Sequence, residues 1–284
     1  MNKFLINLFR LIRPLSNVKN IALIILSFYL SKADFNLILF LAGFLSLSFV
    51  CSSFYAYNTL YDYNLDKNDK NKNHYSEAID YLGRKTSFVI FISLLTCGFI
   101  IGFFVNFNFL SVLALLALTN FFYSSKKFRF KERVILDVLF GATFTFFFRF
   151  VASWFIFSVS IPPLLVAIAL VSAKSAGYLL YKEVDRPFFE ASKVKNSITA
   201  VKKETIIIIS AIFWLICFLS FFLLCFGSKY FPIKFLFLLP LAIPPLIIVY
   251  LSALNKIKTK IKYLRIIGFI YWLLILIIIF KLLW

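Results

Sequence analysis

Long runs of apolar residues, separated by short polar segments, constrain this chain more than any other feature of its sequence. A helix needs about 20 mainly apolar residues to cross a bilayer, and these runs do not alternate as the wall of a membrane β-barrel would. The sequence therefore predicts an all-α polytopic membrane protein with about nine transmembrane helices, at residues 20–30, 36–60, 86–106, 107–123, 134–157, 160–181, 205–226, 231–254 and 263–283.

The composition excludes a soluble fold. Apolar residues make up 62% of the 284 residues and charged residues 15%, against about 45–50% and about 25% in soluble domains. A soluble core of this size could not bury so much apolar surface. We expect a single integral-membrane domain over residues 1–284, in which residues 1–19 form an amphipathic, basic segment on the membrane surface.

Positive charge is concentrated on one side of the predicted topology. The chain has 31 Lys and Arg against 12 Asp and Glu, which gives a formal net charge of +19. The N-terminus and the loops after the even-numbered spans hold 25 of the basic residues, and the opposite loops hold 4. Because cytoplasmic loops are enriched in Lys and Arg, we expect a cytoplasmic N-terminus. Orientation and anionic lipid headgroups then explain the charge, and we expect no nucleic-acid partner.

Half of the few carboxylates fall in two clusters at the predicted cytoplasmic boundary. One cluster follows the second span and the other follows the sixth, and together they comprise Asp62, Asp66, Asp69, Glu183, Asp185 and Glu190. A single cluster of this kind is commonly a solvated helix end. Two clusters at the same depth favour a functional site.

The first cluster contains the pattern N-x3-D-x3-D, formed by Asn58, Asp62 and Asp66. Residues four apart differ by only about 40° around a helix, so these three side chains share one face. Mg²⁺ prefers oxygen ligands and is commonly held by one or two carboxylates together with substrate phosphates. The pattern therefore predicts a site for a Mg²⁺-diphosphate complex at the membrane boundary.

These motifs resemble those of the UbiA superfamily of intramembrane prenyltransferases. The resemblance rests on the first aspartate motif, on the segment 178–186 after the sixth span, and on Lys72, Tyr123, Ser124, Lys126 and Lys127. The segment 178–186 departs from the D-x3-D arrangement usual in the family. The resemblance implies helices bundled around a central cavity, with both acidic motifs at its cytoplasmic mouth. It also implies Mg²⁺-dependent transfer of a polyprenyl group from its diphosphate to an acceptor.

The same resemblance implies roles for individual residues. The ligands of metal and diphosphate would be Asn58, Asp62 and Asp66, with Glu183 and Asp185 as candidates from the second motif. Among them, Asp62, Asp66 and Asp185 would be the catalytic carboxylates. The phosphate groups would be contacted by Lys72, Lys126 and Lys182.

Charged and aromatic residues inside the predicted spans add further candidates, because intramembrane ionisable groups are costly and usually functional. Lys174 lies two turns before Lys182 on the same helix face, so it could line the cavity, although a structural role is equally open. Tyr178 could bind substrate by stabilising a carbocation or simply mark the membrane interface. Arg149 is too deep to reach the cytoplasmic end, and could approach the external boundary or bond a neighbouring helix. Asp137 lies within a turn of a basic loop.

Two other functions stay open at this point. Residues 123–152 resemble the branch of the superfamily that transfers phosphoribose from a phosphoribosyl diphosphate to a polyprenyl phosphate. The charges inside the spans would also suit a membrane transporter or lipid-handling protein, although the sequence does not offer the matched pair of broken helices that such proteins use. The acceptor, the isoprenoid length and the oligomeric state are left open by the sequence.

Overall fold

The computed structural model describes residues 2–69 and 71–227, together with scattered positions between 231 and 270. Within these residues, seven helices are long and apolar enough to cross a membrane, and no strand is present. The all-α membrane architecture is thereby confirmed. The predicted spans 231–254 and 263–283 lie outside the described residues except at those scattered positions, so the count of nine stays a prediction, as does the cytoplasmic N-terminus.

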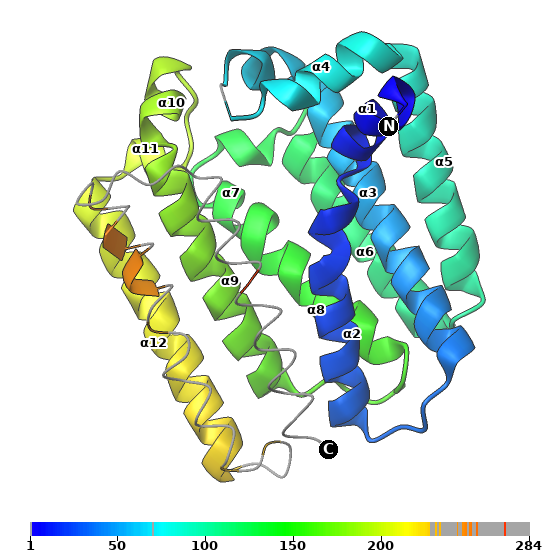
Figure 1. Ribbon diagram of the computed structural model, residues 1–284. Helices are drawn as coiled ribbons and strands as arrows, with labels where there is room; N and C mark the ends of the chain where they lie inside the picture. The colour runs from blue at the N-terminus through cyan, green and yellow to red at the C-terminus, as the bar shows by residue number, and fades with distance from the viewer. Residues whose placement is uncertain are drawn as a thin grey trace. The chain divides into compact units, whose positions relative to one another are not determined.

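The chain divides into two compact units, residues 1–131 with 147–162 and residues 132–146 with 163–284. The first unit contains α1 (Lys3–Ile12), η1 (Pro14–Asn17), α2 (Val18–Ser31), α3 (Leu37–Asn68), α4 (Asn73–Leu82), α5 (Arg84–Phe103), α6 (Phe107–Ser124) and most of α8 (Phe144–Phe155) (Figure 1). A short turn, η2 (Phe130–Glu132), lies at its end. The second unit contains α7 (Leu136–Val138), η3 (Leu139–Thr143), α9 (Leu164–Val184), α10 (Arg186–Ala191), α11 (Ser197–Ala200) and α12 (Lys203–Gly227).

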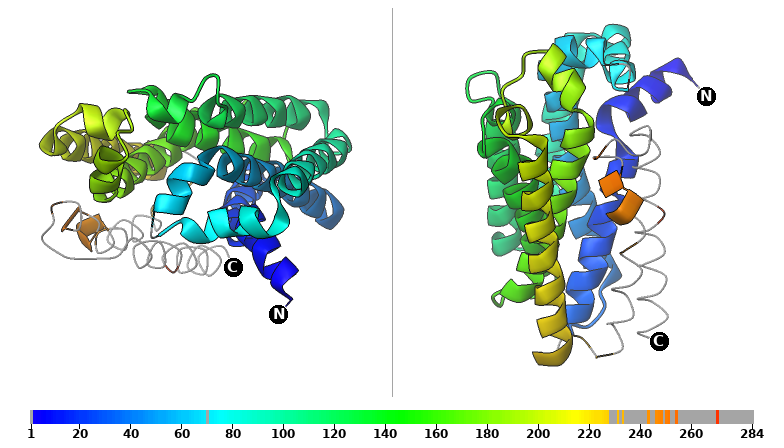
Figure 2. Two further views of the ribbon diagram at one scale, coloured as in Figure 1. Left: turned by 90° about the horizontal axis from the view of Figure 1, so that it is seen from above. Right: turned by 90° about the vertical axis from the view of Figure 1, so that its left-hand side faces the viewer.

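A sharp break separates the N-terminal helix α1 from α2. Arg13 has a left-handed backbone (φ 49°) and Pro14 follows it, so the α-helix does not continue through this point. Figure 2 shows that α1 leaves the line of α2. It packs against α4, while Phe4 and Phe9 stay exposed. This arrangement suits a helix that lies along a membrane surface.

The helix α3 forms the centre of the first unit, because α1, α2, α4, α5 and α6 all pack against it. Its contact with α5 is close at Gly98, where an added Cβ would lie 2.7 Å from Val50 Cγ2 and 3.1 Å from the Ser46 carbonyl oxygen. The Ser46 hydroxyl donates a hydrogen bond of 2.7 Å to the Gly98 carbonyl. Small residues allow membrane helices to approach each other in this way.

The fifth predicted span, residues 134–157, is not one regular helix. The short helix α7 is followed by η3, a wider π-helical turn, before α8 begins. The Thr145 hydroxyl donates a 2.5 Å hydrogen bond to the Phe140 carbonyl, five residues earlier, which helps to hold the wide turn. The Asp137 carboxylate accepts hydrogen bonds from the backbone N–H and the hydroxyl of Ser197, which joins α7 to α11.

In the second unit, α9 and α12 lie side by side (Figure 1). The Ser210 hydroxyl of α12 donates to the Ala176 carbonyl of α9 at 3.1 Å. A small core of Leu179, Ile198 and Ile206 connects α9, α11 and α12. The end of α9, which carries Glu183 of the second acidic motif, is thereby held against α11 and α12.

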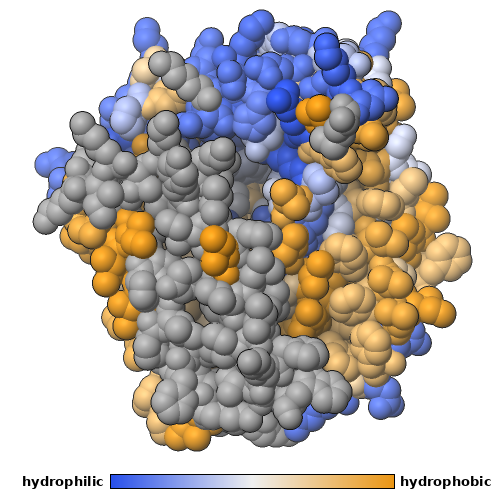
Figure 3. Space-filling view, viewed as in Figure 1, coloured by the Kyte–Doolittle hydropathy of each residue, from blue (hydrophilic) through white to orange (hydrophobic). Residues whose placement is uncertain are grey.

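Large apolar side chains cover the outer faces of the long helices. Figure 3 shows hydrophobic residues along the flank of α5, and hydrophilic residues over α1 and α4 at the end of the same unit. On α5, Val89 is 61% exposed and Phe103 is 68% exposed. On α12, Ile208, Ile212 and Leu215 are exposed in the same way. Such surfaces are stable in hydrocarbon and not in water, and the chain is an integral membrane protein.

Candidate functional site

The N-x3-D-x3-D pattern lies on the last turns of α3, which continues as a helix to Asn68. Asp62 and Asp66 are buried, and the half-buried Asn58 lies one turn before Asp62. The predicted helical face is therefore formed. It lies near the carboxyl end of α3, against which α4 packs (Figure 1).

Basic side chains from the segment after α6 reach this face. Lys131 forms a buried ion pair with Asp62, and its ammonium also donates a 3.3 Å hydrogen bond to the Asn58 side-chain oxygen. Arg129 Nη2 lies 3.8 Å from Asp62 Oδ1. The Ser124 hydroxyl donates to the same Asn58 oxygen at 2.9 Å. The Asp62 carboxylate is therefore compensated by two cations from one loop.

Charges from other parts of the first unit surround the second aspartate. The charges of Asp62, Arg13, Lys72 and Lys131 act on Asp66. Arg13 is held in place by a 2.8 Å hydrogen bond from its Nη2 to the Thr59 hydroxyl and by the Tyr75 ring, 3.5 Å from its guanidinium carbon. Cations from three separate segments thus converge on one end of α3.

The lysines that the resemblance singled out have different surroundings. Lys72 forms an ion pair of 2.8 Å with Asp69, just beyond α3. Lys126 is exposed two residues after α6 ends, whereas the buried Lys131, five residues later, makes the contact with Asp62. The structure therefore brings Lys131 to the first aspartate of the motif, and Lys72 to the carboxylate that follows the motif.

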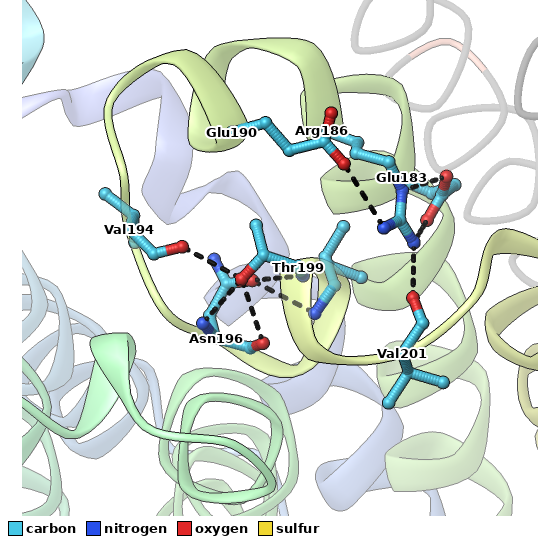
Figure 4. Close-up of polar contacts among 8 residues, drawn as sticks. Glu183, Arg186, Glu190, Val194, Asn196, Thr199 and Val201 are labelled. Carbon is cyan, nitrogen blue, oxygen red and sulfur yellow. Dashed lines mark hydrogen bonds and ion pairs between the residues drawn. The ribbon is translucent and has the colours of Figure 1, made fainter.

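The second acidic segment lies in the second unit, where α9 ends and α10 begins (Figure 4). Arg186 donates from Nε to Glu183 Oε1 at 2.7 Å and from Nη2 to Glu183 Oε2 at 2.8 Å. The same Nη2 donates to the Val201 carbonyl at 2.9 Å, and Nη1 lies 3.6 Å from Glu190. The hydrogen bond with Glu183 is the main reason why the pKa of Arg186 is raised. Both oxygens of Glu183 are thus engaged by one guanidinium.

The other residues predicted to belong to the site lie on α9 or directly after its end. Asp185 directly follows the end of α9, and its carbonyl accepts the Phe188 N–H at 3.0 Å as α10 begins. The Lys182 ammonium lies 5.2 Å from the centroid of the Tyr178 ring. Lys174 is half-buried one turn before Tyr178. The four-residue spacing places Lys174, Tyr178 and Lys182 along one face of the helix.

The chemistry of the donors in the first unit fits Mg²⁺. Asn58, Asp62 and Asp66 offer oxygen atoms alone, and Mg²⁺ typically completes its coordination with water and substrate phosphate. Within the part of the chain that the structure describes, no group of three or more His, Cys, Asp and Glu is arranged to hold a metal by itself. A cation at this face would therefore share its coordination with a ligand, and it would replace the Lys131 ammonium at Asp62.

Sequence reasoning misses Arg13, Arg129 and Lys131, since it counts them only toward the charge of the cytoplasmic side. They come from segments on either side of α3 in the chain, so no spacing connects them to the aspartates. One available signal is the alternation of basic and aromatic residues in the segment 127–131. The structure does not form this segment as an extended strand, because Arg129 has a left-handed backbone (φ 46°) and a 3-10 turn begins at Phe130.

Comparison with known proteins gives a consistent assignment of family and fold. A model of the UbiA prenyltransferase family matches residues 21–281. No curated protein matches the chain. A solved UbiA homologue from Archaeoglobus fulgidus bound to GPP and Mg²⁺ is similar, with a TM-score of 0.71 and 17% identity over 94% of this chain and 96% of that one.

Two further solved structures are similar. The A. fulgidus homologue bound to DMAPP and Mg²⁺ has a TM-score of 0.58 and 18% identity over 87% of this chain and 96% of that one. A structure described as digeranylgeranylglyceryl phosphate synthase has a TM-score of 0.70 and 18% identity over 96% of this chain and 97% of that one. At this level of identity the likeness concerns the fold.

Proposed function

The chain belongs to the UbiA prenyltransferase family, and on that premise we propose that it is a Mg²⁺-dependent membrane enzyme that transfers a polyprenyl group from its diphosphate to an acceptor. The observation that carries the proposal is the face of α3 on which Asn58, Asp62 and Asp66 lie beside Lys131 and Arg129. Oxygen donors for a divalent cation and cations for phosphate oxygens are the two parts of a metal-diphosphate site. The homologous structures with GPP or DMAPP and Mg²⁺ support this reading.

Some residues of the first unit would bind the metal, and others would bind the phosphate groups of the donor. Mg²⁺, when bound, supplies positive charge that stabilises the diphosphate leaving group. Asp62, Asp66 and Asn58 would hold it through their oxygens. Lys131 and Arg129 would hold phosphate oxygens, and would be released from Asp62 as the cation takes their place. As the bond between the allylic carbon and the diphosphate oxygen breaks, charge grows on the diphosphate, so fixed cations there lower the barrier.

The remaining predicted residues are part of the same proposal. The second motif would supply Asp185 and Glu183 as further ligands, and Glu183 would have to exchange its bidentate Arg186 pair for the metal. Phosphate or prenyl contacts are proposed for Lys72, Lys126, Lys174, Tyr178 and Lys182. The basic loops favour a site that faces the cytoplasm.

Donor binding gives a direct test. The purified full chain in detergent is mixed with labelled geranylgeranyl diphosphate, with Mg²⁺ or with EDTA, and retained label is measured. We expect binding that depends on Mg²⁺, because the diphosphate and the carboxylates repel each other without it. Asp62→Ala and Asp66→Ala should each weaken binding about 10- to 100-fold, since each removes an oxygen ligand.

The matched control is Asp34→Ala. Asp34 is an exposed carboxylate that precedes the other end of α3, and its removal should leave binding unchanged. Metal-independent binding, or full binding by the double variant Asp62→Ala/Asp66→Ala, would overturn the proposal.

The alternative within the family is transfer of phosphoribose to a polyprenyl phosphate. A sugar diphosphate donor would use the same pairing of carboxylates and cations, and Arg129 with Lys131 could compensate its phosphate charges. The same binding assay with labelled phosphoribosyl pyrophosphate separates the two. Retention of that label, with no retention of geranylgeranyl diphosphate, would favour the alternative.

A further inference from the structure

A second group of cations lies in the membrane-spanning part of the first unit. Arg149 of α8 is only 4% exposed, and its hydrogen-bond acceptors among the described residues are distant: the Asn20 amide oxygen at 3.5 Å and the Tyr55 hydroxyl at 3.4 Å. Its Nε is buried and has no hydrogen-bond partner among the residues that the structure describes. A guanidinium normally directs its donors in pairs at carboxylate or phosphate, so the donors of Arg149 are only partly used.

Lys19 of α2 brings another positive charge to the same place. Its ammonium lies 5.9 Å from the centroid of the Tyr55 ring, and its charge interacts with both Tyr55 and Arg149. The surrounding polar side chains are neutral amides and hydroxyls from η1, α2 and α3, namely Asn17, Asn20, Ser48 and Ser52. The side chains of Arg149 and Lys19 therefore both interact with Tyr55.

No carboxylate compensates these charges within the described residues, where neither Arg149 nor Lys19 forms an ion pair. An unpaired charge is costly to bury, and cations at membrane depth usually pair or mark the path of a ligand. Two cations directed at one hydroxyl also repel each other. An oxyanion between them would remove both costs.

This group of cations is displaced along α3 from the donor site, and Arg13 lies near both, with its guanidinium carbon 5.6 Å from the centroid of the Tyr55 ring. Tyr55 precedes Asp62 by seven residues on α3, which corresponds to about 10 Å along the helix axis. A single diphosphate held at Asp62 does not extend over two helical turns. The anion that suits Arg149 and Lys19 therefore belongs to another molecule.

We propose that Arg149 and Lys19 bind the phosphate or carboxylate group of the acceptor substrate, with the Tyr55 hydroxyl and the Asn20 amide as further hydrogen-bond partners. The identification of this molecule as the acceptor rests on the proposed transferase function, whereas the binding of an anion does not. In this arrangement the acceptor is anchored deeper in the membrane than the diphosphate. Its reacting atom then lies between its own anion and the leaving group at the end of α3.

Anion binding is measured on the purified full chain in detergent with EDTA present, so that the metal site does not contribute. Thermal stability is recorded against geranylgeranyl monophosphate as a lipid phosphate, and against inorganic phosphate and benzoate as soluble anions, with geranylgeraniol as the uncharged control. We expect at least one anion to raise the melting temperature where geranylgeraniol does not. The anion that acts at the lowest concentration indicates whether the acceptor is a lipid phosphate, a soluble phosphate or a carboxylate.

Charge-removing variants assign the binding to this group. Arg149→Gln and Lys19→Gln should each weaken the preferred anion about tenfold or more, because each removes a charge-assisted hydrogen bond. Arg10→Gln, which removes an exposed guanidinium paired with Glu77, should bind normally. So should Asp62→Ala/Asp66→Ala, which separates this result from a failure of the donor-site proposal.

Two outcomes would overturn the inference. One is an equal response to geranylgeraniol and to every anion. The other is unchanged affinity in Lys19→Gln, whose half-buried position should tolerate the change even where Arg149→Gln fails to fold. Loss of binding in Lys131→Met with no loss in Lys19→Gln would likewise assign the anion to the end of α3.

Discussion

At Asp62, a carboxylate on α3 meets an ammonium from residue 131, almost 70 positions further along the chain. A buried carboxylate left without a partner would be strongly destabilising, so the pair keeps the face of α3 ordered while no cation is bound. The same ammonium is well placed for a phosphate oxygen once Asp62 turns to a metal. Lys131 would therefore pair with Asp62 when the proposed site is empty, and with a phosphate oxygen when metal and donor are bound.

Removal of this charge gives a prediction at the residue scale. Lys131→Met should weaken binding of geranylgeranyl diphosphate in the presence of Mg²⁺ about tenfold, because a charge-assisted hydrogen bond is worth about 1.5–3 kcal/mol. The label-retention assay described above measures the dissociation constant.

The control for this change is Lys127→Met in the same loop. Lys127 is exposed, and its ammonium lies 5.8 Å from the centroid of the Phe128 ring. Equal weakening in both variants would show that the loop acts through its general positive charge and not through the contact with Asp62.

Among the elements, the packing of α3 against α5 sets how the site-bearing helix is held. Gly98 allows the two backbones to approach, and a methyl group there would overlap Val50. Membrane helices gain little from the hydrophobic effect, so close contact and interhelical hydrogen bonds such as that from Ser46 carry much of their association.

Gly98→Ala should therefore lower the thermal stability of the purified protein. The added methyl group forces a shift against backbone atoms of α3, and overpacking of this kind costs about 1–3 kcal/mol. The melting temperature in detergent measures the effect. Gly177→Ala on α9 is the comparison, because an added Cβ there meets nothing within 4 Å. An unchanged melting temperature in Gly98→Ala would contradict the close packing of these helices.

For the whole molecule, the distribution of basic residues predicts the orientation in the membrane. A fluorescent protein that matures only in the cytoplasm should be bright when fused after Lys85, and alkaline phosphatase, which is active only outside, should be active when fused after Lys229. Exchange of the two reporters is the internal control. The reverse pattern would place the proposed donor site on the external face and contradict the predicted topology.

The sequence predicted the elements better than it predicted the surroundings of the site. The helical face of Asn58, Asp62 and Asp66 was predictable because a four-residue period acts within one helix. The irregular turn before α8 was not, since it depends on one hydroxyl bonding a carbonyl five residues back. The partner of Glu183 was missed although Arg186 is only three residues away, because local spacing does not say which of several charges will pair.

By itself, the sequence determined that this chain is a helical membrane protein with an oxygen-rich face at the end of one helix. The first conclusion follows from the long apolar runs, and the second from the four-residue spacing of polar residues within one helix. Only the tertiary structure decided that Lys131 and Arg129 meet Asp62, that Arg13 bonds Thr59 of α3, and that Arg149 meets Tyr55. The physical reason is that a charge lowers its energy with whichever partner packing brings near, and packing joins residues that no sequence period relates.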